Sequence, residues 1–231
     1  MTANRDVSKI EAGNPPRSNT HGILHEASHY DFLMGMAMYG GERAFREKVL
    51  RLARLEAGES VLDVGCGTGT LAVAAKRRVG PMGIVCGIDA SPEMIARAGK
   101  KAEKAGIEVI FKKEIAQSLP FPDAEFEVVL STLMLHHLPE KARQQCAHEI
   151  RRVLKQGGRV LTVDYGESSG KKSSFFLHFH HRYGHVDLRE IIAVLSEAGL
   201  EIIESGALKI RDLHFVLATK DTGRATEEPK L

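Results

Sequence analysis

Residues 61–70 read Val-Leu-Asp-Val-Gly-Cys-Gly-Thr-Gly-Thr, an apolar run that leads directly into a glycine-rich turn. Residues 71–79 continue with apolar positions at helical spacing, so the stretch predicts a buried strand, a turn and a helix. Glycines allow a backbone to approach a ligand closely, and a helix N-terminus offers free N–H groups at the positive end of its dipole. The pattern therefore favours a nucleotide-like ligand over a tight turn that binds nothing.

Two carboxylates indicate which ligand this is. Asp63 lies near the end of the first predicted strand, and Asp89 lies 26 residues further on, at the end of the second. A carboxylate at position 63 would repel a pyrophosphate and attract an ammonium or sulfonium group, whereas Asp89 can hold ribose hydroxyls. A dinucleotide-binding loop would also have glycine at position 70, where this chain has threonine. These features favour S-adenosylmethionine (SAM), with an NAD-dependent oxidoreductase as an alternative.

The surrounding chain alternates short apolar runs with helical patterns, which predicts βαβ units and a mostly parallel sheet covered by helices on both faces. The predicted strands are 61–65, 83–89, 108–113, 126–132 and 159–165, and the predicted helices are 71–79, 91–106 and 142–154. Gly106 and the pair Gly157-Gly158 are expected to end helices. Two further strands, 201–210 and 214–220, are joined by only three residues and must therefore be antiparallel.

The chain is expected to form a single domain between two tails. Residues 1–22 predict a disordered tail, since they include few large apolar residues and hold Pro15-Pro16, and residues 221–231 predict a frayed one. Within the domain 23–220 we expect cover helices at 23–55, broken at Gly40-Gly41, and a ligand-binding core at 60–165. A second cover segment, 166–187, precedes a helix and the antiparallel hairpin in 188–220.

Composition excludes several classes of protein. The 231 residues are 43% apolar and 27% charged, as in an ordinary globular domain, and a net charge of +2 does not favour a dedicated nucleic-acid binder. The three cysteines form no disulfide framework and no CxxC metal pattern, so a reducing, cytoplasmic location is expected. No apolar run approaches the roughly 20 residues that span a bilayer, and no signal-peptide core is present.

Five stretches together resemble the class I SAM-dependent methyltransferases, in particular the branch that includes the ubiquinone and menaquinone biosynthesis enzymes. They are 61–69, GIDASPEMI at 87–95, SLPFPDAEFEVVLST at 118–132, LHHLP at 135–139 and IRRVLKQGGRVLTVD at 150–164. The resemblance implies a Rossmann-like α/β/α sandwich whose seven-stranded sheet ends in an antiparallel strand. It also implies SAM as the cofactor and transfer of its methyl group to a small-molecule acceptor. We expect a monomer or a homodimer.

The resemblance assigns roles residue by residue. Asp63 and the loop Gly65-Cys66-Gly67 would hold the methionine part of SAM, and Asp89 would hold the ribose. The remaining positions would border the adenine or the methionine moiety, and they are Ala90, Met94, Ile115, Ala116, Ser131 and Leu133. Tyr30, in the first cover helix, is a candidate to border SAM or the acceptor, or simply to pack.

One position departs from the family. Where the family usually has an aspartate that accepts a hydrogen bond from the adenine amino group, this chain has Ile115. Either Glu114 substitutes for it, or the backbone at Ala116 recognises the adenine alone. A missing contact of this kind costs about 1 kcal/mol, which weakens affinity without abolishing it.

The histidines include a candidate base for the acceptor and two clusters elsewhere in the chain. His136, after the fourth predicted strand, is the candidate catalytic residue that accepts or orients the acceptor's proton, with a loop-capping role as the alternative. Histidines also gather at positions 21–29 and 178–185, where we assign cover segments rather than a metal site. Aromatic residues between 175 and 183 favour an apolar acceptor, such as a quinone precursor, an aromatic compound or a lipid-like molecule.

Two other functions stay open or are disfavoured. A SAM-binding protein without transfer activity remains an alternative, because Ile115 weakens the expected site. A nucleic-acid methyltransferase is disfavoured, since the segment 131–134 reads Ser-Thr-Leu-Met instead of an Asn/Asp-Pro-Pro-Tyr/Phe motif.

Overall fold

A computed structural model describes residues 41–166, 187–210 and 212–221. Several sequence predictions therefore lie outside the described residues. They are the N-terminal tail, the first cover helix with Tyr30, both histidine-rich segments, the aromatic residues at 175–183 and nearly all of the two segments 166–187 and 221–231.

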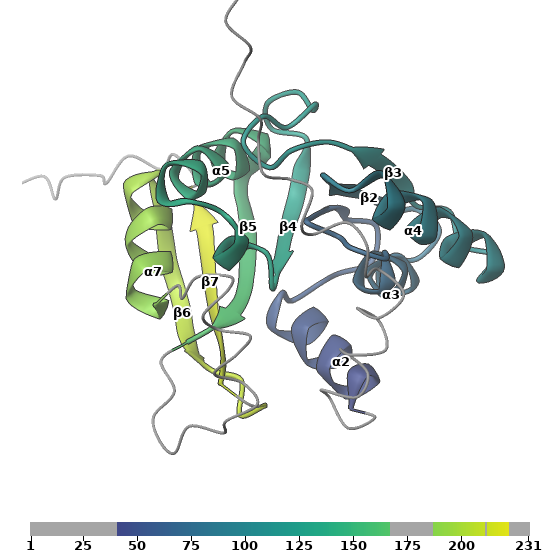
Figure 1. Ribbon diagram of the computed structural model, residues 1–231, viewed down its shortest axis with the longest axis horizontal. Coiled ribbons are helices and arrows are strands. Elements are labelled where there is room, and N and C mark those ends of the chain that lie inside the picture. Colours follow the sequence, from purple (N-terminus) through teal and green to yellow (C-terminus); the bar gives the residue numbers. More distant parts are fainter. Residues whose placement is uncertain (1–40, 167–186, 211, 222–231) are drawn as a thin grey trace, which may run out of the picture.

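The centre of the domain is one seven-stranded sheet with the strand order β3-β2-β1-β4-β5-β7-β6 (Figure 1). Neighbouring strands from β3 to β5 pair in parallel, and β7 is antiparallel to both β5 and β6. The predicted mostly parallel sheet with an antiparallel C-terminal hairpin is confirmed. The strands are β1 (Ser60–Val64), β2 (Ile84–Asp89), β3 (Ile110–Lys113), β4 (Phe126–Thr132), β5 (Leu154–Tyr165), β6 (Leu200–Ala207) and β7 (Leu213–Lys220).

Helices cover both faces of this sheet, which makes three layers. On one face α2 and α3 pack on the sheet, with α4 beside α3 and along β2 and β3. On the other face α5 and α7 pack against each other and the sheet. Their bounds are α2 (Glu42–Leu52), α3 (Thr70–Val79), α4 (Pro92–Lys104), α5 (Glu140–Val153) and α7 (Leu188–Glu197), and a short 3₁₀ helix, η2 (Leu135–His137), precedes α5.

Local sequence explains most of these boundaries. The hydroxyl of Ser91 accepts a hydrogen bond from the Met94 backbone at 3.3 Å, and Pro92 occupies the first position of α4. One prediction is wrong: α5 ends at Val153, and Gly157-Gly158 lie inside β5. There they lie in a β-bulge of the β4–β5 pair, because Phe126 pairs with Leu154 whereas Val128 pairs with Arg159.

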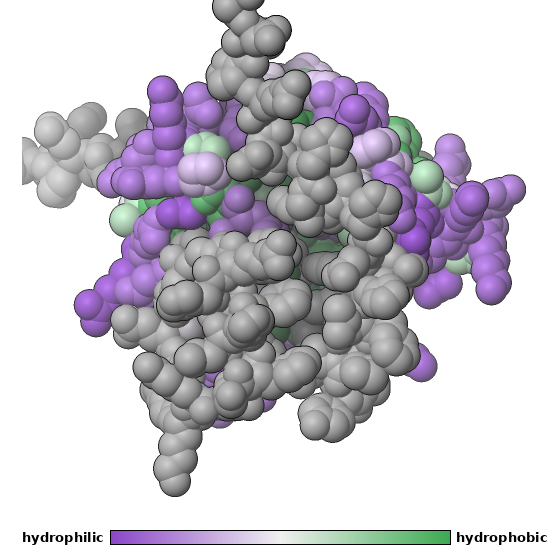
Figure 2. Space-filling view, in the orientation of Figure 1, coloured by the Kyte–Doolittle hydropathy of each residue, from purple (hydrophilic) through white to green (hydrophobic). Residues whose placement is uncertain are grey.

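Alternation along the strands builds two apolar cores. In β1, Val61 packs on the α2 and α3 face, and Leu62 and Val64 pack on the α5 and α7 face. The side chain of Asp63 therefore points toward the face that carries α3. Figure 2 shows hydrophilic side chains over the outer helices on the viewed face. Among the described residues no helix has the length and apolar character needed to cross a membrane.

Candidate functional site

The glycine turn joins the carboxyl end of β1 to the first residue of α3. The backbone N–H groups of Gly65 and Cys66 both donate to the Ile88 carbonyl at 2.9 Å, which ties the turn to the end of β2. Gly65, Gly67 and Gly69 have φ values of +74°, +53° and +74°, a region that side chains adopt only with strain. Burial raises the pKa of the Cys66 thiol far above its usual range, so it remains protonated and is a poor nucleophile.

The three glycines differ in what surrounds them. A Cβ on Gly65 would lie 2.3 Å from Cγ of Met134, and one on Gly69 would lie 2.7 Å from both Ala98 and Phe111. A Cβ on Gly67 would meet no atom of the described residues within 4 Å. Packing thus requires glycine at 65 and 69, whereas the open side at Gly67 leaves a ligand room to approach the backbone.

Asp63 is a buried carboxylate with an unused hydrogen-bonding atom. Its side chain is 2% exposed, and its Oδ2 has no hydrogen-bond partner in the part of the chain that the structure describes. Burial raises its pKa to about 7, and the nearby charge of Asp89 adds to the rise. A backbone hydrogen bond from Ala72, in the first turn of α3, acts in the opposite direction. A carboxylate in this state lacks a cationic partner.

Asp89 is held at the end of β2 by the backbone around it. Its Oδ2 accepts from Gly67 N–H and its Oδ1 from Ser91 N–H, both at 2.9 Å. Burial raises its pKa, and these two hydrogen bonds offset part of that rise. Each carboxylate oxygen keeps a lone pair, so the fixed group can still accept from the hydroxyls of a ligand.

A lysine on α4 supports the glycine turn. The ammonium of Lys101 donates to Oγ1 of Thr68 at 2.7 Å and also to Oγ1 of Thr70. Thr68 is buried in the turn, and Thr70 begins α3. Sequence reasoning missed this support because the partners lie about thirty residues away and meet only in the fold.

The positions expected near an adenine gather at the ends of β2 and β3. These strands are parallel neighbours, and the Glu114 backbone donates to the Asp89 carbonyl at 3.1 Å. Ile115 follows β3 and is 51% exposed, and Ala116 after it is buried. Ala90 is exposed after β2, and Met94 is half-buried in the first turn of α4.

The segment after β4 crosses from the glycine turn toward β5. The hydroxyl of Ser131 is buried and has no partner among the described residues. Leu133 has φ +55°, and its N–H donates to the Val163 carbonyl at 2.8 Å. Such a conformation costs a non-glycine residue about 1–2 kcal/mol, and strain of this kind is common at functional sites. Met134, the next residue, packs over Gly65.

His136 meets a carboxylate that the sequence did not single out. Its Nδ1 lies 2.7 Å from Oδ1 of Asp164, near the end of β5, and its backbone N–H donates to Oδ2 at 3.2 Å. Its ring also meets the edge of Tyr165, with centroids 5.3 Å apart. Asp164 lies near the carboxyl end of a predicted strand, as Asp63 and Asp89 do, and this position was the sequence signal that could have found it.

Five neighbouring parallel strands therefore place candidate groups along one edge of the sheet. From β3 to β5 the order is Ile115, Asp89, Asp63, Ser131 and Asp164. The carboxyl edge of such a sheet is where α/β proteins bind their ligands.

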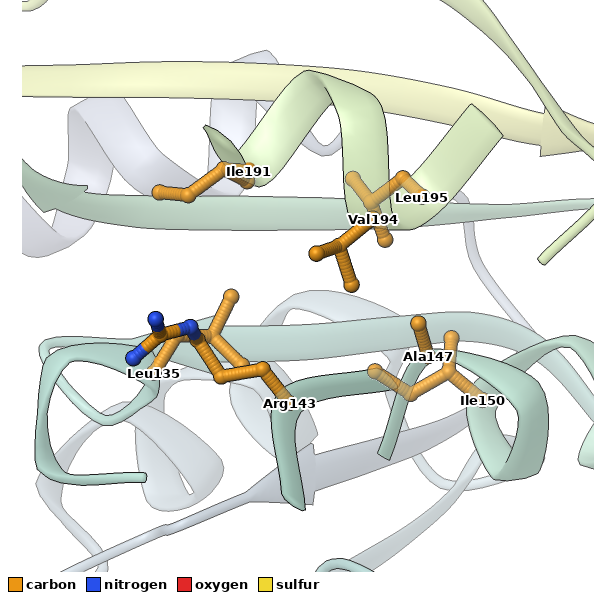
Figure 3. A pocket seen from close by; sticks show the side chains of 7 residues that line it. All are labelled: Leu135, Arg143, Ala147, Ile150, Ile191, Val194 and Leu195. Carbon is orange, nitrogen blue, oxygen red and sulfur yellow. The ribbon is translucent and has the colours of Figure 1, made fainter. Parts of the chain in front are cut away.

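A small cavity lies away from this edge, between α5 and α7 (Figure 3). It measures about 10 Å³, the room of roughly one water molecule, and six of its seven lining residues are apolar. The seventh, Arg143, pairs with Glu190 on α7. This cavity is part of the packing between two helices and is too small for a nucleotide or an acceptor.

Comparison with known proteins agrees with this geometry. Residues 61–158 match the family described as "Methyltransferase domain". The chain is 33% identical over 148 residues to the demethylmenaquinone methyltransferase of Lactobacillus johnsonii, covering 63% of this chain and 60% of that protein. It is 31% identical over 167 residues to the Listeria welshimeri enzyme of the same name, covering 70% of this chain and 69% of that protein.

A solved structure gives the same fold. A SAM-dependent methyltransferase from Aquifex aeolicus superposes with a TM-score of 0.68 at 24% identity, over 84% of this chain and 98% of that one. The strand-end carboxylates, the glycine turn and the matched sequences converge on one family. This chain belongs to the class I SAM-dependent methyltransferases, in the branch that includes the demethylmenaquinone methyltransferases.

Proposed function

We propose that this chain transfers a methyl group from SAM to a small apolar acceptor. The observation that carries the proposal is the buried Asp63 carboxylate. Among the described residues one of its oxygens has no partner, and none of them fills the space beside Gly67 in the adjoining turn. A ligand that brings a cation to this point would complete the site, and SAM carries an ammonium and a sulfonium group.

The other groups along the sheet edge suit the remaining parts of SAM. The N-terminus of α3 can receive its carboxylate, and Asp89 can accept from the ribose hydroxyls. Ala90, Met94, Ile115 and Ala116 offer a largely apolar border for the adenine, with Met94 as a polarizable surface. Ser131, near the end of β4, and Leu133, which follows that strand, complete the border of the methionine part.

Methyl transfer requires mainly that the protein align two reactants. The sulfonium supplies an activated methyl group, and the acceptor displaces the sulfur in line. Alignment of two reactants contributes up to about 7–11 kcal/mol in well-oriented systems, and exclusion of water protects the methyl donor. Within this proposal His136 is the catalytic residue that receives the acceptor's proton.

The acceptor we favour is aromatic and quinone-like. The support is the similarity to two demethylmenaquinone methyltransferases and the pairing of His136 with the Tyr165 ring at the same sheet edge. A SAM-binding protein without transfer activity is the second candidate, because Ile115 offers no hydrogen bond to the adenine.

Calorimetric titration of SAM and of its demethylated product tests the proposal. We expect micromolar binding by the wild type and a loss of at least about tenfold in Asp89→Ala, since two or more hydrogen bonds to a charged group disappear. Asp123→Ala is the matched control, because Asp123 lies on the exposed surface and pairs with Arg152. Absence of binding by the wild type would refute the proposal.

Release of demethylated SAM then separates the two candidate functions. A panel of a reduced naphthoquinone, a long-chain phenol and an alkylamine, each with SAM, is expected to show turnover with an aromatic acceptor. Binding of SAM without turnover of any acceptor would favour the second candidate.

Replacing Ile115 by aspartate should tighten SAM binding by about three- to tenfold, since one hydrogen bond contributes about 1 kcal/mol. The exposed position lets a carboxylate remain hydrated, so the fold should tolerate the change. Titration of S-inosylmethionine, whose base carries an oxygen in place of the amino group, provides the control. If Ile115→Asp strengthens both ligands equally, its effect is general electrostatics and not recognition of the amino group.

A further inference from the structure

The segment between β4 and α5 connects the glycine turn to a buried carboxylate. Met134 packs over Gly65, and two residues later His136 is hydrogen-bonded to Asp164 through both its ring and its backbone. One short piece of chain therefore links the glycine turn, where we propose that the methyl donor binds, to an imidazole.

Asp164 is a buried carboxylate that is held by three hydrogen bonds. Its Oδ1 accepts from Nδ1 of His136 at 2.7 Å and from the Tyr165 backbone at 2.8 Å, and its Oδ2 accepts from the His136 backbone at 3.2 Å. It is 1% exposed. Because an ionised carboxylate only accepts, Nδ1 of His136 must carry the hydrogen, and in the neutral ring the lone pair is then on Nε2.

The groups around His136 leave it as the proton acceptor. His137, whose ring centroid lies 3.9 Å away, has its pKa lowered to about 4, mainly by burial and further by the charge of His136. It is therefore neutral near pH 7. Tyr165 presents a ring edge, and His214 on β7 stands opposite Asp164 in the sheet register. No described residue hydrogen-bonds to Nε2 of His136.

We propose that Asp164 is the positioning residue that fixes this tautomer, so that Nε2 of His136 takes the proton from a hydroxyl acceptor during methyl transfer. This inference rests on the proposed function and adds the class of acceptor atom. The O–H bond breaks and its proton goes to Nε2, while the oxygen forms a bond to the methyl carbon. The bond from that carbon to sulfur breaks, and its electron pair stays on sulfur. The positive charge that begins on sulfur ends on an imidazolium beside the Asp164 carboxylate.

The tautomer can be measured without an acceptor. Nitrogen-15 NMR of the histidine rings at pH 8 should show His136 with the hydrogen on Nδ1 and none on Nε2. The His136→Asn variant assigns the signal, and loss of that signal from Asp164→Asn would support the pairing. A hydrogen on Nε2 in the wild type would overturn the proposal, and this result does not depend on whether SAM binds.

Kinetics test the role. With 1,4-naphthalenediol as the hydroxyl probe, kcat should fall by about 100-fold or more in His136→Asn and in Asp164→Asn, within the usual range for a general base. The double variant should lose no more than the stronger single one, because the two residues act as a unit. The affinity for SAM should stay within threefold, which also shows that the variants fold.

The exposed residues His148 and Asp123 supply matched controls. His148→Asn and Asp123→Asn should keep wild-type kcat. Losses that multiply in the double variant would mean that the residues act independently, which overturns the proposal. If the wild type binds SAM but does not methylate the probe, the proposed function fails for this acceptor, and the NMR result still decides whether the tautomer is fixed.

Discussion

Asp63→Asn is expected to abolish useful SAM binding while it stabilises the free protein near neutral pH. The wild-type carboxylate is buried, and one of its oxygens has no partner in residues 41–166, 187–210 and 212–221, so the ammonium of SAM would be the cation that balances it. Removing one partner of a buried charged pair costs about 2–4 kcal/mol, which is roughly 30- to 1,000-fold in Kd. Without ligand, the buried charge destabilises the folded protein, and asparagine has no such charge.

The pH dependence of stability follows from the same group. Its pKa is about 7 in the folded protein, against 3.8 as the ordinary value. Between these two values the folded chain holds a proton that the unfolded chain has lost. Stability therefore falls as pH rises through this window, and the loss is complete above about pH 7. Asparagine does not titrate, so the variant should lack this part of the slope.

Thermal unfolding at pH 5 and pH 8, without ligand, measures the effect. The melting temperature of Asp63→Asn minus that of wild type should be larger at pH 8 than at pH 5. For the exposed control Asp123→Asn this difference should be the same at both pH values. In the wild type, affinity for SAM should increase from pH 6 to pH 7.5 as Asp63 ionises. An Asp63→Asn variant that binds SAM as tightly as wild type would disprove the role of this carboxylate.

Gly67→Ala should separate ligand binding from folding. Position 67 has φ +53° and open space around a Cβ, so the substitution costs about 1–2 kcal/mol of stability through backbone strain alone. The added methyl group would stand where SAM must approach the turn. We therefore expect a loss of at least about 100-fold in affinity from a variant that still folds, because a clash with the backbone-bound part of a ligand is not easily relieved.

Gly106→Ala is the matched control for this experiment. Gly106 has φ +62°, lies after the far end of α4, and would also meet nothing within 4 Å. Both variants should lose similar stability in urea unfolding, and only Gly67→Ala should lose SAM in calorimetry. Equal losses of affinity in the two variants would show that the effect comes from general destabilisation.

Much of the fold could be predicted from local pattern, because buried strands and amphipathic helices each impose a period on the sequence. The antiparallel pairing of the last two strands follows from a three-residue connection. The pattern could not show that β7 lies between β5 and β6, since the order of strands depends on contacts across the sheet. Nor could it show that Gly157-Gly158 belong to a strand, because glycine pairs are common both at helix ends and at bulges.

The residues of the site show the same difference between local pattern and contacts made by the fold. Asp63 and Asp89 could be singled out because strand ends near a glycine turn are ligand positions in this kind of sheet. Asp164 has the same kind of position, but its importance comes from His136, 28 residues earlier in the chain. Lys101 likewise depends on threonines that only the packing of α4 beside α3 brings within reach. Pairings of this kind produce no periodic pattern in the sequence.

The place of β7 has a consequence for synthesis. During translation β6 leaves the ribosome before β7, yet within the sheet β6 pairs only with β7. Until β7 inserts beside β5, residues 200–207 have no strand to pair with, and β5 presents an open edge to other chains. A chain that stops at residue 212 should therefore be more sensitive to protease and more dependent on chaperones than the full chain, when both are held on the ribosome by the same C-terminal linker, long enough to clear the exit tunnel.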